Sequence, residues 1–79
     1  MNTQLVSGLR PVSRLLTQRQ KDCLRWAARG KSSTDIGAIL NISRNTVDEH
    51  LGNACLRLGV RTRLQAALMA ARLGLIDLE

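Results

Sequence analysis

Apolar residues recur along most of this chain at the three- and four-residue spacing of amphipathic α-helices. The segment Thr17-Gln18-Arg19-Gln20 has the T-x-x-Q pattern of a capping box, in which the threonine hydroxyl and the glutamine amide satisfy free backbone N–H groups. Gly30 suits the left-handed conformation that ends many helices. The pattern predicts a first helix over residues 18–29. Its inner stripe consists of Leu16, Gln20, Cys23, Leu24 and Ala27.

Two more helices are predicted with only three residues between them. Ser32 is a favourable N-cap for a short helix over residues 33–40, which ends at Asn41. Ser43 caps a longer helix over residues 44–58, which ends at Gly59. A short helix, a three-residue turn and a longer helix form a helix-turn-helix. The expected inner residues are Ile36, Ile39 and Leu40 in the first of this pair and Val47, Leu51, Ala54, Cys55 and Leu58 in the second.

Gly37 lies inside the shorter of these two helices, where glycine costs about 1 kcal/mol relative to alanine. A small side chain is required there if the two helices of the pair cross closely. The position of Gly37 therefore supports the helix-turn-helix.

A fourth helix is predicted to open at Thr62-Arg63-Leu64-Gln65, a second T-x-x-Q segment, and to close at Gly74. Its interior is apolar nearly all the way round, so a domain this small is expected to cover one side while a second copy of the chain covers another. The alternative is that the helix is merely rich in alanine. The residues expected at the subunit interface are Leu64, Ala67, Leu68, Ala71 and Leu75.

The chain has 79 residues, enough for one domain. Residues 1–15 contain Gly8 and Pro11 and lack a helical period, which predicts a flexible or loosely docked N-terminal arm. Residues 16–79 are expected to form the folded domain. The predicted fold class is all-α, a four-helix bundle with a helix-turn-helix and without a winged helix.

The net charge of the chain limits the kinds of partner that it is expected to bind. Twelve Lys and Arg against six Asp and Glu give a formal net charge of +6, which favours a polyanion or an acidic membrane surface, although a solvated basic face is the simpler alternative. A single Trp, with no Phe or Tyr, leaves almost no aromatic side chains on which unpaired bases could stack. Double-stranded DNA is therefore the expected partner.

The sequence gives little support for a metal-binding or disulfide-rich protein, an enzyme or a membrane protein. Cys23 and Cys55, with His50 as the one histidine, have neither the spacing of a zinc site nor that of a disulfide framework. His50 is only one or two positions from Glu49 and Asp48, and such neighbours do not face each other on a helix, so we expect no enzyme active site and no cofactor. No apolar run is long enough to span a membrane, and a cytoplasmic protein is expected.

From Leu16 to Ile76 the sequence resembles the LuxR/GerE family of bacterial transcription regulators. The matching segments are Leu16-Thr17-x-Arg19, Trp26-x-Ala28-x-Gly30-Lys31-Ser32, Ile42-Ser43-x-x-Thr46-Val47-x-x-His50, Leu58-Gly59-Val60, Arg63 and Gln65-Ala66. The tryptophan at position 26 makes the sequence most similar to the quorum-sensing subgroup of the family, whose complete proteins sense acyl-homoserine lactones.

The resemblance implies a module that dimerises through its fourth helix and inserts its third helix into the major groove. In this family such a module usually follows a sensory domain. Both an excised domain and a naturally short regulator fit the 79 residues.

The resemblance also assigns roles to individual residues. It implies contacts with the DNA backbone from Lys31, Thr46 and His50. Further backbone contacts are expected from the polar and basic residues Ser32, Arg44, Arg57, Arg61 and Arg63. The resemblance implies contacts with base edges at Asp48, Glu49 and Gly52, and Asn45 is expected to join them. No metal ligands are expected.

The sequence departs from the family at positions 48 and 52, where basic side chains are common. A carboxylate of Asp48 or Glu49 can accept a hydrogen bond from N4 of cytosine, so these acids can read a base pair. Alternatively, this surface has lost its preference for DNA and now binds a protein partner. The leading hypothesis is a sequence-specific dimeric regulator with the helix over residues 44–58 in the major groove. The alternative is a truncated module that pairs with a full-length LuxR-type regulator and inhibits it.

Overall fold

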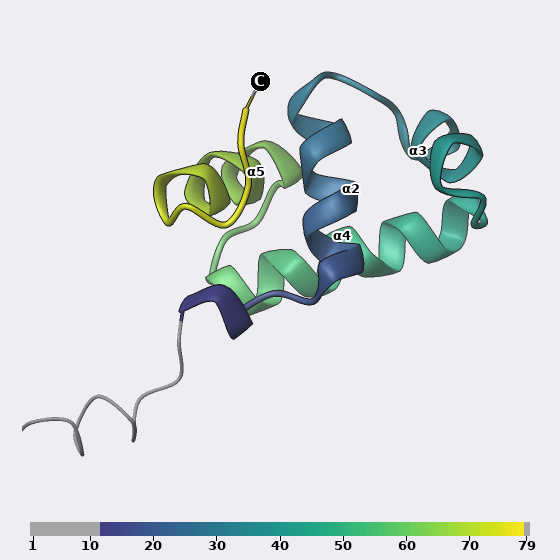
Figure 1. Ribbon diagram of the computed structural model, residues 1–79. Coiled ribbons are helices and arrows are strands. Elements are labelled where there is room, and N and C mark those ends of the chain that lie inside the picture. The colour runs from purple at the N-terminus through teal and green to yellow at the C-terminus, as the bar shows by residue number, and fades with distance from the viewer. Residues whose placement is uncertain (1–11, 79) are drawn as a thin grey trace, which may run out of the picture.

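The computed structural model describes residues 12–78, and within them it contains four α-helices, a short 3-10 helix and no strand. The helices wrap around a common core, with α2 crossing in front of α4 in the view of Figure 1. The all-α, helix-turn-helix prediction is confirmed. The elements are η1 (Val12–Arg14), α2 (Gln18–Ala28), α3 (Ser33–Leu40), α4 (Arg44–Leu58) and α5 (Arg63–Arg72).

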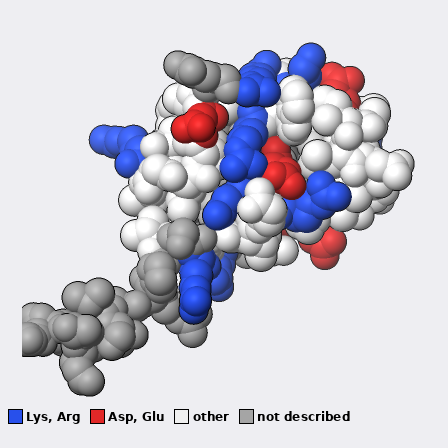
Figure 2. Space-filling model, viewed as in Figure 1, with Lys and Arg blue, Asp and Glu red and all other residues white. Residues whose placement is uncertain are grey.

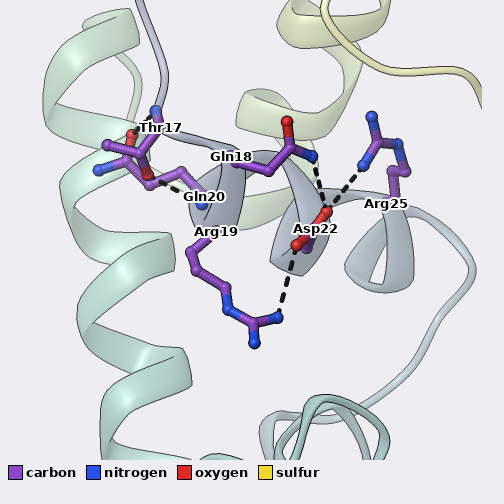
Figure 3. A network of polar contacts seen from close by, with 6 residues as sticks. All are labelled: Thr17, Gln18, Arg19, Gln20, Asp22 and Arg25. Carbon is purple, nitrogen blue, oxygen red and sulfur yellow. Dashed lines mark hydrogen bonds and ion pairs between the residues drawn. The ribbon is translucent and has the colours of Figure 1, made fainter.

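Local capping interactions explain where the helices begin. Thr17 Oγ1 accepts from the Gln20 backbone N–H at 3.1 Å, and the Thr17 N–H donates to Gln20 Oε1 at 2.9 Å (Figure 3). Thr62 and Gln65 form the same pair of bonds at the start of α5. Both predicted capping boxes are therefore present.

Left-handed residues explain where the helices end. Asn41 has φ 59° after α3, and Gly59 has φ 71° after α4. Both are conformations that favour asparagine and glycine over other residues. The predicted bounds of α3 and α4 are confirmed, whereas α2 ends at Ala28 and not at residue 29.

The core is aliphatic, as expected from a chain so poor in aromatic residues. Gln20 is the one buried polar residue in the described part of the chain, and it uses its side-chain oxygen in the capping box. Ile39 is a correction to the predicted inner face of α3, because 44% of its surface is exposed. The core consists of Leu16, Cys23, Leu24, Ile36, Val47, Leu51, Ala54, Ala66, Ala67, Ala70, Leu75 and Ile76.

Helix α5 packs against both α2 and α4 through small side chains. Ala67 and Leu75, which were expected at a subunit interface, are buried in the core of the protomer itself. Ala71 is half-buried and packs against that core. By contrast, 61% of Leu64 and 48% of Leu68 are exposed. The apolar surface that α5 offers to a second copy therefore centres on Leu64 and Leu68.

The chain before α2 is joined to α4. Arg57 Nε donates to the Leu15 carbonyl oxygen at 3.2 Å, and Leu15 packs against the core. Of the predicted N-terminal arm, residues 12–14 form η1 and Leu15 forms this contact. The prediction for residues 1–11 lies outside the described residues. No helix in the described part of the chain is long and apolar enough to span a membrane.

Candidate nucleic-acid interface

The start of α4 is capped by Ser43 and exposed to solvent. Ser43 Oγ accepts from the Thr46 backbone N–H at 3.0 Å and lies 2.8 Å from Thr46 Oγ1. The exposed residues Arg44 and Asn45 therefore project from a turn whose backbone is fixed. Because the backbone of this helix end is already ordered by its cap, little conformational entropy of that backbone is lost when a partner binds there.

One face of α4 is buried and another is exposed along most of its length. Val47, Leu51 and Ala54 pack into the core. Asn45, Glu49 and Gly52 are exposed, and their spacing of four and three residues places them on one stripe of the helix. No atom lies within 4 Å of the position that a Cβ on Gly52 would occupy, so the backbone is accessible there. We call Asn45, Glu49 and Gly52 the reading stripe.

Asp48 lies beside the reading stripe and joins three helices. Its Oδ1 accepts a short hydrogen bond from the Ser33 hydroxyl of α3 and a bond of 3.2 Å from Arg63 Nη2 of α5. The Ser33 hydrogen bond, followed by the hydrogen bond and charge of Arg63 and the charge of Arg44, holds the pKa of Asp48 below its usual value. The Asp48 carboxylate is therefore ionised at neutral pH and already has partners within the chain.

Glu49 differs from Asp48, although the two acids are neighbours in the sequence. Among the described residues, no hydrogen bond or ion pair involves the Glu49 carboxylate. The Glu49 carboxylate thus has no partner among the described residues, whereas one oxygen of Asp48 is already engaged.

Three basic residues lie at or just before the starts of α3, α4 and α5, the three helices that Asp48 joins. Lys31 precedes α3, Arg44 begins α4 and Arg61 precedes α5. Their side chains are exposed and form no ion pair with any residue in the range 12–78. These three cations, which we call the flanking cations, are therefore free to pair with an external anion. Ser32 caps α3 beside Lys31, and His50 is half-buried on α4.

Arg57 does not join this group. It lies thirteen residues after Arg44 on the same helix, a rise of about 20 Å. Its guanidinium is bonded to Leu15, beside a groove that also contains Arg14 and Lys21. The structure therefore does not bring Arg57 together with the other expected DNA-backbone residues.

A second basic surface runs along α2. Figure 2 shows a band of Lys and Arg side chains on this face of the molecule, with acidic side chains beside it. Asp22 pairs with Arg25 at 2.9 Å and with Arg19 at 3.5 Å, and it accepts from Gln18 Nε2 at 3.0 Å (Figure 3). Part of the positive charge on α2 is therefore neutralised within the helix, which favours the start of α4 as the anion-binding surface.

An open hollow adjoins the reading stripe. It has a volume of about 330 Å³ and lies between α4 and the segment that leads into α5. Its lining residues are Asp48, Leu51, Gly52, Cys55, Arg61 and Arg63. The hollow is polar, with both arginines at one side. It therefore adds room for an anionic group next to Gly52.

Ser33 is a member of this site that the sequence did not indicate. It is fifteen positions before Asp48, and Arg63 is fifteen positions after it. A contact between residues so far apart has no local sequence signal. Only the packing of α3 and α5 on α4 brings the three together.

Residues 14–70 match the model of the family described as bacterial regulatory proteins, luxR family. The chain is 45% identical over 75 residues to the HTH-type transcriptional regulator y4qH of Sinorhizobium fredii, covering 92% of this chain and 23% of that protein. It is 48% identical over 62 residues to the transcriptional activator protein LuxR of Aliivibrio fischeri, covering 78% of this chain and 25% of that protein. The chain thus spans about a quarter of the length of these relatives.

A solved structure agrees with these sequence matches. The transcription factor GerE has a TM-score of 0.78 and 40% identity to this chain. The similarity covers 82% of this chain and 97% of GerE. The likeness therefore extends over almost the whole of that structure, the helix-turn-helix included.

Proposed function

Because the chain belongs to the luxR family of bacterial regulatory proteins, we propose that it binds a specific sequence of double-stranded DNA as a homodimer in the cytoplasm, with α4 in the major groove. The observation that carries the proposal is the exposed reading stripe beside the flanking cations Lys31, Arg44 and Arg61. The family is one of transcription regulators and not of enzymes.

The reading stripe has the chemistry needed for base contacts. The major groove is about 12 Å wide and admits an α-helix. The Asn45 amide can donate to and accept from adenine, and the Glu49 carboxylate can accept from N4 of cytosine. Gly52 has no side chain to hold the helix away from the bases. Selection of the DNA sequence is therefore assigned to Asn45 and Glu49.

The flanking cations provide affinity without reading sequence. Phosphate contacts fix the position of a protein on the duplex and account for most of the salt dependence of binding. Lys31, Arg44 and Arg61 lie at or just before the starts of three different helices, so we propose that they contact phosphates from three separate segments. Ser32, Thr46, His50 and Arg63 are proposed as further backbone contacts.

The proposed dimer forms through α5. Leu64 and Leu68 are four residues apart and are exposed on the same helix face. Two such faces related by a two-fold axis would cover each other's leucines, because an isologous interface uses the same surface patch on both copies. The two α4 helices would then enter successive major grooves about 34 Å apart, one turn of DNA.

Selection from a library of random DNA duplexes tests the proposal. We expect enrichment of a two-fold symmetric sequence with half-sites about one helical turn apart. Affinity for the selected duplex should fall by about tenfold or more between 50 and 200 mM salt, since several phosphates are neutralised. The absence of an enriched sequence, or affinity that is unchanged by salt, would contradict the proposal.

A further inference from the structure

Asp48 holds the one ion pair between helices in the described part of the chain, since the other two pairs lie within α2. Its partner Arg63 belongs to the group of residues proposed to contact DNA phosphates. The Asp48 carboxylate therefore occupies a guanidinium that the duplex would also use.

We infer that Asp48 is an internal competitor for DNA phosphate, and that Arg63 exchanges the Asp48 carboxylate for a phosphate oxygen when the duplex docks. This inference rests on the proposed function, because it specifies how the same surface meets its ligand. It assigns to Asp48 a role in setting affinity through Arg63, and not a role in reading a base.

The geometry of the pair permits such an exchange. The side chains of Arg63 and Asp48 are 42% and 48% exposed, so the pair lies at the surface where a phosphate can reach it. Carboxylate and phosphate oxygens both accept charge-assisted hydrogen bonds from the N–H groups of a guanidinium. The adjoining hollow, lined also by Arg61 and Gly52, leaves space for the incoming group.

The other partner of Asp48 keeps the carboxylate in place during the exchange. Ser33 donates to the same oxygen, Oδ1, from the first turn of α3. Because the pKa of Asp48 is held below its usual value, the carboxylate is charged at neutral pH. Binding must therefore separate a charged pair, and protonation of Asp48 does not remove that cost at neutral pH.

Glu49 supplies a matched control on the same helix. It carries the same charge one residue away and forms no ion pair with a described residue. Any general repulsion between α4 carboxylates and DNA acts on Glu49 and Asp48 alike. An effect that operates through Arg63 acts on Asp48 only.

The test compares Asp48→Asn and Glu49→Gln in the wild-type and Arg63→Gln backgrounds, with dissociation constants measured for the selected duplex and for a scrambled one. We expect Asp48→Asn to tighten binding to both duplexes by about two- to fivefold, the range for loss of an exposed ion pair. In the Arg63→Gln background the part of this gain that operates through Arg63 should be lost, so the remaining gain should be smaller. Glu49→Gln should change affinity by the same factor in both backgrounds.

Two outcomes of the binding measurements would overturn the inference. An equal gain from Asp48→Asn with and without Arg63 would show general charge repulsion. A loss of affinity confined to the selected duplex would show that Asp48 reads a base.

A measurement on the free protein separates failure of this inference from failure of the proposed function. The pKa of the Asp48 carboxyl group, followed by carbon NMR, should lie below the usual aspartate value and rise in Arg63→Gln. No rise in that variant would show that the bridge is not formed in solution and would overturn the inference. If the protein binds no duplex, the proposed function is contradicted. The inference then fails with it, because no phosphate is present to replace the Asp48 carboxylate at Arg63.

Discussion

Gly37→Ala is expected to lower the free energy of unfolding by about 2 kcal/mol. This would be the opposite of the usual effect, because replacing glycine by alanine inside a helix normally stabilises the protein. A Cβ on residue 37 would lie 2.6 Å from the Ile42 carbonyl oxygen and 3.4 Å from the Arg44 nitrogen. These are backbone atoms of the turn and of the start of α4, so neither can rotate away. The turn is also held by the Ile42 N–H, which donates to the Gly37 carbonyl oxygen at 2.9 Å.

Thermal unfolding of Gly37→Ala checks this expectation, with Gly52→Ala as its matched control. For a domain of this size, 2 kcal/mol corresponds to a decrease in Tm of about 8–16 °C. Gly52 is also inside a helix, but nothing lies near its missing Cβ, so Gly52→Ala should stabilise by about 0.5–1 kcal/mol. A Gly37→Ala variant as stable as the wild type would contradict the close approach of the turn to α3.

The double variant Leu64→Gln/Leu68→Gln is expected to lose about hundredfold in affinity for a symmetric duplex while keeping its fold. Both leucines are exposed in the protomer, so replacing them removes little from its core. In a dimer, binding of one subunit to its half-site holds the reading stripe of the other subunit at a high effective concentration next to the second half-site. A monomer lacks this second, linked contact and therefore binds the symmetric duplex more weakly. Sedimentation analysis and titration of the selected duplex measure the two effects.

Leu56→Gln is the control for this variant. Leu56 is 79% exposed, more than either leucine of α5, but it lies on α4. Its replacement should leave the mass in solution unchanged, because Leu56 lies outside α5. If the α5 double variant sediments as the wild type does and binds the duplex equally well, dimerisation through α5 is contradicted.

Local chemistry made the helix bounds predictable. The hydroxyl of Ser43 and the two T-x-x-Q segments act on N–H groups within three residues, so a reader of the sequence can identify them. The same holds for Asn41 and Gly59, whose left-handed conformations end α3 and α4. Gly37 was predictable as a close approach, although the atoms it approaches belong to the turn as well as to α4.

The faces of the helices were harder to predict. Ile39 fits a helical stripe in the sequence, but α3 is only eight residues long and packs mainly on α4, so this side chain remains exposed. Helix α5 is apolar on nearly every side, and its pattern therefore gives no signal of which side meets the core. Ala67 and Leu75 were assigned to the subunit interface for that reason.

The charged residues of the site show the same limit. Asp48, as a carboxylate at a base-facing position, suggested a reader of cytosine, but its bonds to Ser33 and Arg63 depend on three helices meeting. Arg57 suggested a phosphate contact by its charge, whereas the fold bonds it to Leu15. Net charge favours a class of partner, and packing decides which charged groups already have partners within the chain.

Backbone amide NMR of the chain titrated with the selected duplex tests the central claim most directly. If α4 enters the groove between the flanking cations, the largest shifts will fall at Lys31 and Ser32 and over residues 44–52. The buried face of α2 should shift little. Shifts concentrated instead on the basic band of α2, with residues 44–52 unchanged, would contradict the assignment of α4 as the DNA-reading helix.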